Sequence, residues 1–115
     1  MVHELELLKN QLNKSKNISL ELLSGMKGDL KVRKKSVQLV QRTILILLVS
    51  ENYRWKSHYE FMLDLIKYMN RESFIKETQF ILNVNEKTAK YILVTTLKEL
   101  ITSFNHKYDS KNKVS

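Results

Sequence analysis

The chain contains no proline and only two glycines, Gly25 and Gly28, in 115 residues. Folds rich in strands need frequent turns, and glycine and proline supply the backbone angles of many turns. Their scarcity favours a mostly helical chain. The length suits one domain with a modest core, because 43% of the residues are hydrophobic, as in ordinary globular proteins. We expect an all-α, compact bundle of about five helices.

Apolar residues at helical spacing indicate where these helices lie. The polar residues 13–17 are expected to interrupt the first of them. Residues 44–49 are apolar all round, which favours a buried helix, although a strand is the competing interpretation because Ile and Val are β-branched. Ser57 and Glu60 match a capping box at the start of another helix. The helices expected before residue 74 cover residues 3–14, 18–26, 30–51 and about 58–69.

The two glycines predict a bend near residue 27. The bend would separate an N-terminal helical segment, residues 1–27, from a main domain, residues 28–104, which a polar tail at residues 105–115 follows. The N-terminal segment carries a leucine stripe that cannot bury itself alone and must dock on the domain or pair with a second chain. We expect it to help form a homodimer. The stripe consists of Leu5, Leu8 and Leu12.

Several classes of function find no support in the residues. The chain has no cysteine, so it has no disulfide framework, thiol nucleophile or cysteine-based metal site. No phosphate-binding loop, nucleophile elbow or metal-binding His pair is present, so we expect no enzyme, no cofactor and no small-molecule substrate. The polar N-terminus and the short apolar runs indicate neither a signal peptide nor a membrane span. These features predict a cytoplasmic protein.

The net charge of +8 is concentrated in one part of the chain. Residues 27–42 carry six bases against Asp29 alone, whereas residues 73–104 carry four lysines against three glutamates. Four of the bases stand at a predicted helix N-terminus, where the helix dipole disfavours positive charge. An anion such as a phosphate backbone would explain their placement, and a solvated basic face is the alternative. These four bases are Lys31, Arg33, Lys34 and Lys35.

Residues 74–101, FIKETQFILNVNEKTAKYILVTTLKELI, predict a short helix, a tight turn and a longer amphipathic helix. The order resembles the helix-turn-helix of DNA-binding regulators, including the winged-helix proteins. Asn83 takes the place of the glycine in the turn, and asparagine tolerates a positive φ. Gln79 stands where the family has a small residue. The residues that match from the turn onward are Asn83, Val84, Asn85, Thr88 and Ala89.

The resemblance implies double-stranded DNA as the partner and a two-fold dimer as the binding form. The second helix would enter the major groove, with Asn85 at its start. A short C-terminal wing could follow Ile101, although no glycine turn signals one. The residues that would face the groove are Lys87, Lys90 and Tyr91.

Three functions are compatible with these features. The first is a small dimeric transcriptional regulator that uses the helix-turn-helix together with the basic helix. The second is a partition or replication accessory protein of a plasmid or phage, which would rely on the same physics. The third is a non-enzymatic helical interaction module that binds an acidic protein partner.

An aromatic-rich patch surrounds the predicted loop before residue 57. It could stack on nucleic-acid bases. Packing over the end of the core is the alternative that we favour. The patch consists of Tyr53, Arg54, Trp55, Tyr59 and Phe61.

Overall fold

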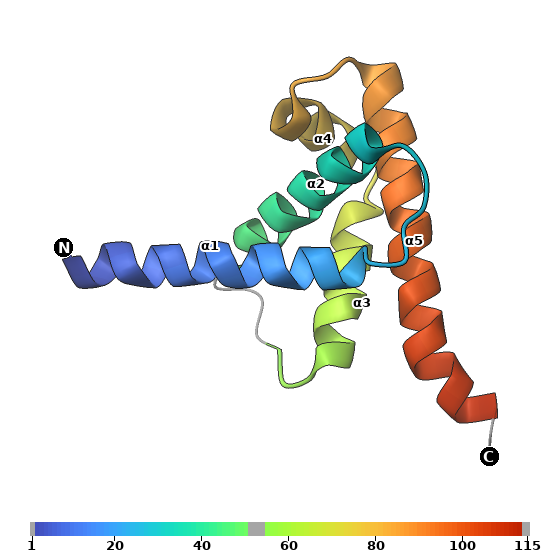
Figure 1. The fold of residues 1–115 in the computed structure, drawn as a ribbon, viewed down its shortest axis with the longest axis horizontal. Coiled ribbons are helices and arrows are strands. Elements are labelled where there is room, and N and C mark those ends of the chain that lie inside the picture. The colour runs from blue at the N-terminus through green and yellow to red at the C-terminus, as the bar shows by residue number, and fades with distance from the viewer. Residues whose placement is uncertain (1, 51–54, 114–115) are drawn as a thin grey trace.

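The computed structural model describes residues 2–50 and 55–113, with side chains at residues 6, 9–50 and 55–108. Within these ranges the chain forms five helices and no strand (Figure 1). The prediction of an all-α bundle of about five helices is confirmed. The helices are α1 (Val2–Leu22), α2 (Leu30–Val49), α3 (His58–Met69), α4 (Phe74–Leu82) and α5 (Glu86–Lys113).

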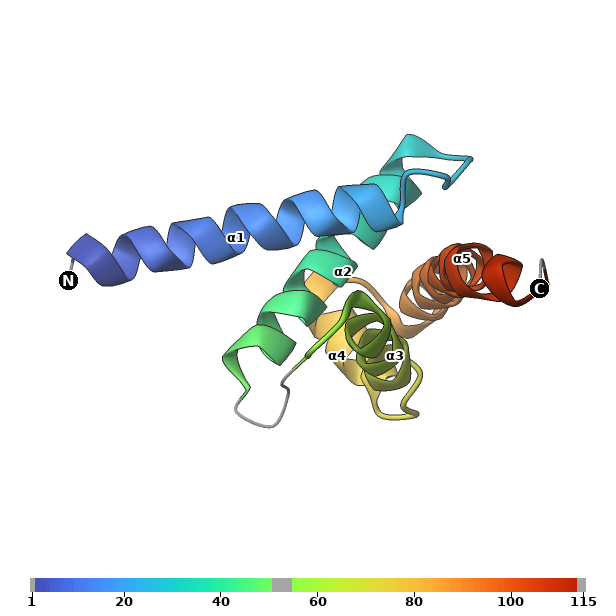
Figure 2. The same cartoon turned by 90° about the horizontal axis from the view of Figure 1, so that it is seen from below.

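Helices α2, α4 and α5 pack against one another, and α3 packs against α2 and α5. Helix α1 lies on α2, and its N-terminal half projects beyond the other helices (Figures 1 and 2). Helix α5 also extends past the body at its C-terminal end. All five helices surround or border one core. Its fully buried side chains include Leu23, Leu39, Leu47, Leu65, Met69, Phe74, Ile92 and Leu100.

Helix α1 is continuous, so the predicted break at residues 13–17 and the separate helix at 18–26 are wrong. Ser15 and Ser19 are fully buried. Each hydroxyl donates to a carbonyl of the preceding turn, Ser15 Oγ to Leu12 O at 2.8 Å and Ser19 Oγ to Ser15 O at 2.7 Å. The hydrogen bonds of both hydroxyls are therefore made within α1. The small serine side chains also suit a helix that packs closely on α2.

The expected bend lies between α1 and α2. Gly28 has a φ of 119°, a conformation that side chains rarely adopt. Asp29 then caps α2, because its Oδ1 accepts a hydrogen bond from Lys31 N at 2.9 Å. Leu22 and Leu23 are buried in the same core as residues of the later helices. The end of the N-terminal segment therefore packs against the main domain.

The apolar stretch at residues 44–49 is helical, which excludes the competing strand. Residues 51–54, the predicted end of this helix and the start of the next loop, lie outside the described residues. The cap at the start of α3 is present, because Glu60 N donates to Ser57 Oγ at 3.2 Å. The return bond differs from the expected one: Glu60 Oε2 accepts from Lys56 N at 2.8 Å, one residue earlier than the capping box requires.

The turn between α4 and α5 has the expected conformation. Asn83 is left-handed, with φ 53° and ψ 53°, and Val84 N donates to Gln79 O at 3.3 Å. Asn85 Oδ1 accepts from Thr88 N at 2.8 Å and so caps α5. Helix α5 then runs to Lys113, so the wing after Ile101 is absent from the described residues, and the described part of the polar tail, residues 105–113, continues this helix.

The left-handed residue gives a first testable prediction. Asn83→Val should lower the free energy of unfolding by about 1–2 kcal/mol, because a Cβ-bearing residue pays this cost in the left-handed region and a β-branched one has no local hydrogen bond to offset it. Asn83→Gly should leave the free energy of unfolding unchanged or raise it slightly, since glycine adopts the left-handed region freely. Urea unfolding followed by far-UV circular dichroism measures both. A glycine variant less stable than the valine variant would contradict the turn geometry.

Candidate nucleic-acid interface

The first two turns of α5 present the predicted groove-facing residues to solvent. Lys87 and Lys90 are exposed, and the Tyr91 side chain is 61% exposed. On the opposite side of α5, Ala89 and Ile92 are buried. Burial of one side of the helix therefore fixes the direction in which the other side points. We call Lys87, Lys90 and Tyr91 the α5 face.

Asn85, the remaining residue expected at this surface, is also exposed. Its side-chain Oδ1 accepts the capping hydrogen bond from Thr88 N, so this oxygen serves the start of the helix. Lys90 Nζ lies 3.9 Å from Glu86 Oε1, a solvent-exposed pair that contributes little to stability.

Helix α4 packs directly on α5. Gln79, at the position where helix-turn-helix proteins have a small residue, is partly exposed. The small residue that is fully buried on α4 is its neighbour Thr78, whose Oγ1 donates to Phe74 O at 2.8 Å. Close packing of the two helices is therefore compatible with glutamine at position 79.

The four bases predicted to contact phosphate all lie in the first two turns of α2. Lys31, Lys34 and Lys35 have the spacing i, i+3 and i+4, so they share one side of the helix, which we call the basic stripe. Gln38 continues the same side, and its Nε2 donates to Ile81 O at 3.4 Å. The basic stripe therefore leads to the end of α4, two residues before the left-handed Asn83.

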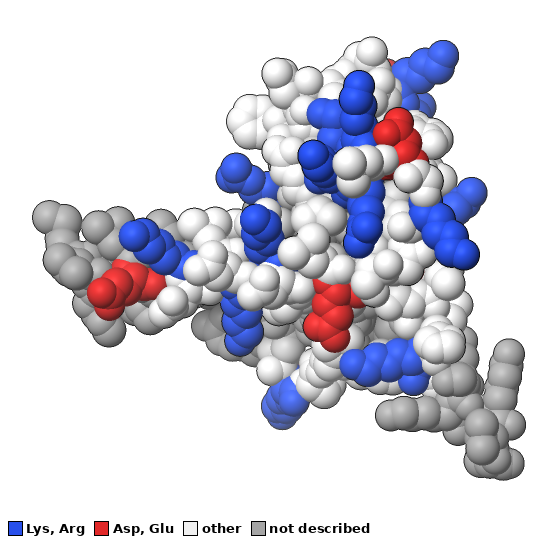
Figure 3. All heavy atoms as spheres, viewed as in Figure 1, with Lys and Arg blue, Asp and Glu red and all other residues white. Residues whose placement is uncertain are grey.

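A second contact joins this part of α2 to α5. Thr96 Oγ1 donates to Ser36 Oγ at 2.8 Å, and both side chains are fully buried. In Figure 3, lysine and arginine side chains gather over the N-terminal part of α2 and the neighbouring part of α5, with few acids among them. The structure thus brings the N-terminal half of α2 together with the end of α4 and the N-terminal half of α5, although 43 and 60 residues separate the contacting side chains in sequence.

The fourth base, Arg33, lies on the side of α2 that faces α1. There it lines an open groove of about 530 Å³ between the two helices, which we call the basic groove. Lys16 of α1 lines it as well, and sequence reasoning missed this residue. Gln41 crosses the groove, and its Nε2 donates to Leu12 O at 3.4 Å. The lining residues are Lys16, Leu20, Leu30, Arg33, Lys34, Val37, Gln38 and Gln41.

The start of α2 has a carboxylate of its own. The carboxylate of Asp29 caps this terminus and places a negative charge next to the first backbone N–H groups. The helix dipole is therefore partly compensated within the chain. An anion bound here would therefore be attracted mainly by the bases around the groove.

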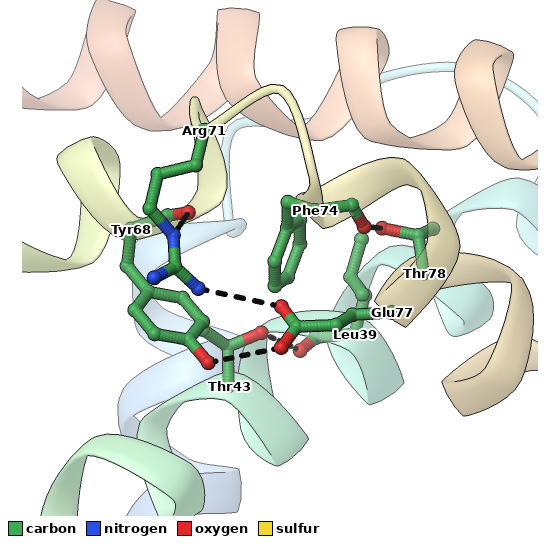
Figure 4. A network of polar contacts seen from close by, with 7 residues as sticks. All are labelled: Leu39, Thr43, Tyr68, Arg71, Phe74, Glu77 and Thr78. Carbon is green, nitrogen blue, oxygen red and sulfur yellow. Dashed lines mark hydrogen bonds and ion pairs between the residues drawn. The ribbon is translucent and has the colours of Figure 1, made fainter.

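A polar network holds the connection between α3 and α4 (Figure 4). Tyr68 Oη donates to Glu77 Oε1 at 3.3 Å, and Arg71 Nη2 lies 3.6 Å from Glu77 Oε2. The Arg71 guanidinium also stacks 3.9 Å from the centre of the Tyr68 ring. Burial, together with the negative charge of Glu77, raises the pKa of Tyr68. Because the network joins two helices, it fixes α4 and hence the turn that precedes α5.

The described members of the aromatic patch contact other side chains of the protein. Trp55 and Phe61 meet edge to face, with ring centroids 4.9 Å apart, and Trp55 Nε1 donates to Asp64 Oδ2 at 2.9 Å. The ring of Tyr59 packs against that of Phe104 on α5, with ring centroids 5.4 Å apart. These contacts fit the packing alternative. Tyr53 and Arg54 lie outside the described residues.

Comparison of the chain with protein family models, curated proteins and solved structures finds no match. The likeness to a helix-turn-helix therefore depends on the residues and geometry given above. No described helix is long and apolar enough to cross a membrane. Within the described ranges, no group of three or more His, Asp or Glu side chains is arranged to hold a metal ion.

Proposed function

We propose that the protein binds double-stranded DNA as a small transcriptional regulator. In this proposal the N-terminal half of α5 enters the major groove, and the bases of α2 and α1 contact phosphates. One observation carries the proposal: the α5 face is exposed, and the part of α2 that bears the basic stripe contacts α4 and the N-terminal half of α5, so one duplex could contact both surfaces. If the α5 face were buried, insertion of α5 into the major groove of DNA would be excluded.

The two surfaces would have different tasks. Lysine side chains at 87 and 90 can donate to guanine or to phosphate, and Tyr91 can contact either. The α5 face contains no arginine, the residue that makes the commonest bidentate contact to guanine, so we expect modest sequence preference. The basic stripe and basic groove would supply affinity, because neutralising phosphates releases counterions.

Two other functions share part of this physics. A partition or replication accessory protein would bind DNA through the same surfaces. An interaction module for an acidic protein would need the basic stripe and would leave the α5 face without a role. The exposure of the α5 face favours DNA.

Homodimerisation remains part of the proposal. The N-terminal half of α1 projects beyond the other helices (Figure 1), and Leu12 within it is 36% exposed. The side chains of Leu5 and Leu8, the other members of the leucine stripe, lie outside the described residues. A second copy of α1 would cover this stripe and would match the two-fold symmetry of many DNA sites.

The recognition role of α5 can be tested with duplexes selected from a random pool by the wild-type protein. Lys87→Gln/Lys90→Gln should lower the preference for the selected over a scrambled duplex by about 1–3 kcal/mol for each lost base contact. Binding to the scrambled duplex should fall much less. Fluorescence anisotropy titrations measure both affinities.

Lys56→Gln/Lys67→Gln is the matched control, because it removes the same charge from exposed positions before and on α3. It should leave the preference unchanged. If the α5 variant weakens both duplexes by the same factor, α5 does not read the sequence.

A further inference from the structure

Four helices meet around a second, smaller pocket on the other side of α1. Its volume is about 290 Å³, a size that suits a small ligand. Ile18 lines it, and this residue lies two positions from both Lys16 and Leu20 of the basic groove, so the two sites use opposite sides of α1. The apolar wall consists of Ile18, Leu22, Ile44, Leu48, Trp55 and Phe61.

The apolar wall is formed by side chains that are held in place. Leu22, Ile44 and Phe61 are buried, so they belong to the core as well as to the pocket. The Trp55 ring is fixed from two directions, by the hydrogen bond from its Nε1 to Asp64 and by the edge-to-face contact with Phe61. A preformed apolar wall loses little conformational entropy when it binds a ligand.

The polar rim of the pocket carries more positive than negative charge. Lys14 comes from α1 and Lys107 from α5, whereas Glu21 is the single acid among the lining residues. Lys107 Nζ lies 3.4 Å from His58 Nδ1, which in turn lies 2.7 Å from the Tyr108 hydroxyl. Burial and the charge of Lys107 lower the pKa of His58 against the opposing effect of Glu21, so the imidazole is mainly neutral near pH 7.

An apolar pocket with an excess of ammonium groups at its edge suits one kind of molecule. We propose that it binds a small amphipathic carboxylate, a medium-chain fatty acid anion in the simplest case. The carboxylate lies between Lys14 and Lys107, and the hydrocarbon chain lies against Trp55 and Phe61. The proposal goes beyond DNA binding and does not depend on it, because the basic groove and the α5 face contribute no residue to this pocket.

The chain contains one tryptophan, so the fluorescence of Trp55 reports directly on the pocket. Titration with octanoate near pH 7 should change this fluorescence saturably, with half-saturation at or below ~1 mM. Octanol, which has the same chain length without the charge, should bind at least fivefold more weakly. No saturable change with octanoate, or equal binding of octanol, overturns the proposal.

Variants of the rim separate recognition of the carboxylate charge from nonspecific hydrophobic binding in the pocket. Lys14→Gln and Lys107→Gln should each weaken octanoate binding by about fivefold, as expected for an exposed ion pair, and should leave octanol binding unchanged. Lys16→Gln is the matched control, since this lysine lies on the other side of α1, and it should have no effect. If Lys16→Gln weakens octanoate as much as Lys14→Gln does, net charge explains the binding and the proposed site is wrong.

Discussion

Replacement of Phe74 by alanine should lower the free energy of unfolding by about 3–5 kcal/mol. The Phe74 ring is fully buried at the start of α4 and meets Tyr68 edge to face, with centroids 5.5 Å apart. The substitution therefore removes apolar burial and leaves a cavity where α3 and α4 join. Because a domain of this kind has a total stability of about 5–15 kcal/mol, the variant keeps only part of it.

The matched control lies on the same helix. Phe80 is 89% exposed, so Phe80→Ala should change the free energy of unfolding by no more than about 0.5 kcal/mol. Urea denaturation followed by far-UV circular dichroism compares the two variants with the wild type. Equal losses of stability from both substitutions would show that α4 packs with a different face inward.

The second large effect concerns duplex binding. Lys16→Gln/Arg33→Gln/Lys34→Gln should weaken binding to any duplex by about 100-fold at ~0.1 M salt, if each base neutralises one phosphate. The same change should reduce the slope of log affinity against log salt by roughly 0.9 for each lost contact. Anisotropy titrations over a range of salt concentrations give both quantities.

A control for this experiment removes the same number of bases elsewhere. Lys9→Gln/Lys56→Gln/Lys67→Gln changes three exposed lysines outside the basic groove. We expect it to reduce affinity far less than the groove variant. If the two triple variants bind equally weakly, net charge governs binding, and the basic groove has no special role.

Local signals in the sequence were enough to predict much of the fold. The scarcity of glycine and proline predicted helices, and the asparagines at 83 and 85 predicted the turn and cap because few residues suit those positions. The continuity of α1 could not be predicted in this way. Ser15 and Ser19 disfavour an isolated helix, and only their burial against α2 explains why the helix continues.

The same distinction applies to the candidate site. The exposure of the α5 face followed from helical spacing, since the apolar side of that helix had to be buried. The contribution of Lys16 to the basic groove required knowledge of how α1 packs on α2, which no local pattern encodes. Phe74 and Phe80 are likewise the same residue type on one helix, and the tertiary packing alone decides that the first is buried and the second exposed.

The most direct test of the account is the affinity of the wild-type protein for duplex DNA as a function of salt. We expect binding at ~50 mM salt that weakens steeply as salt increases, with a log–log slope of roughly −4.5 if about five bases contact phosphates. Basic DNA-binding proteins are near their tightest at such low salt. Absence of duplex binding at ~50 mM salt would contradict the proposal that this protein binds DNA.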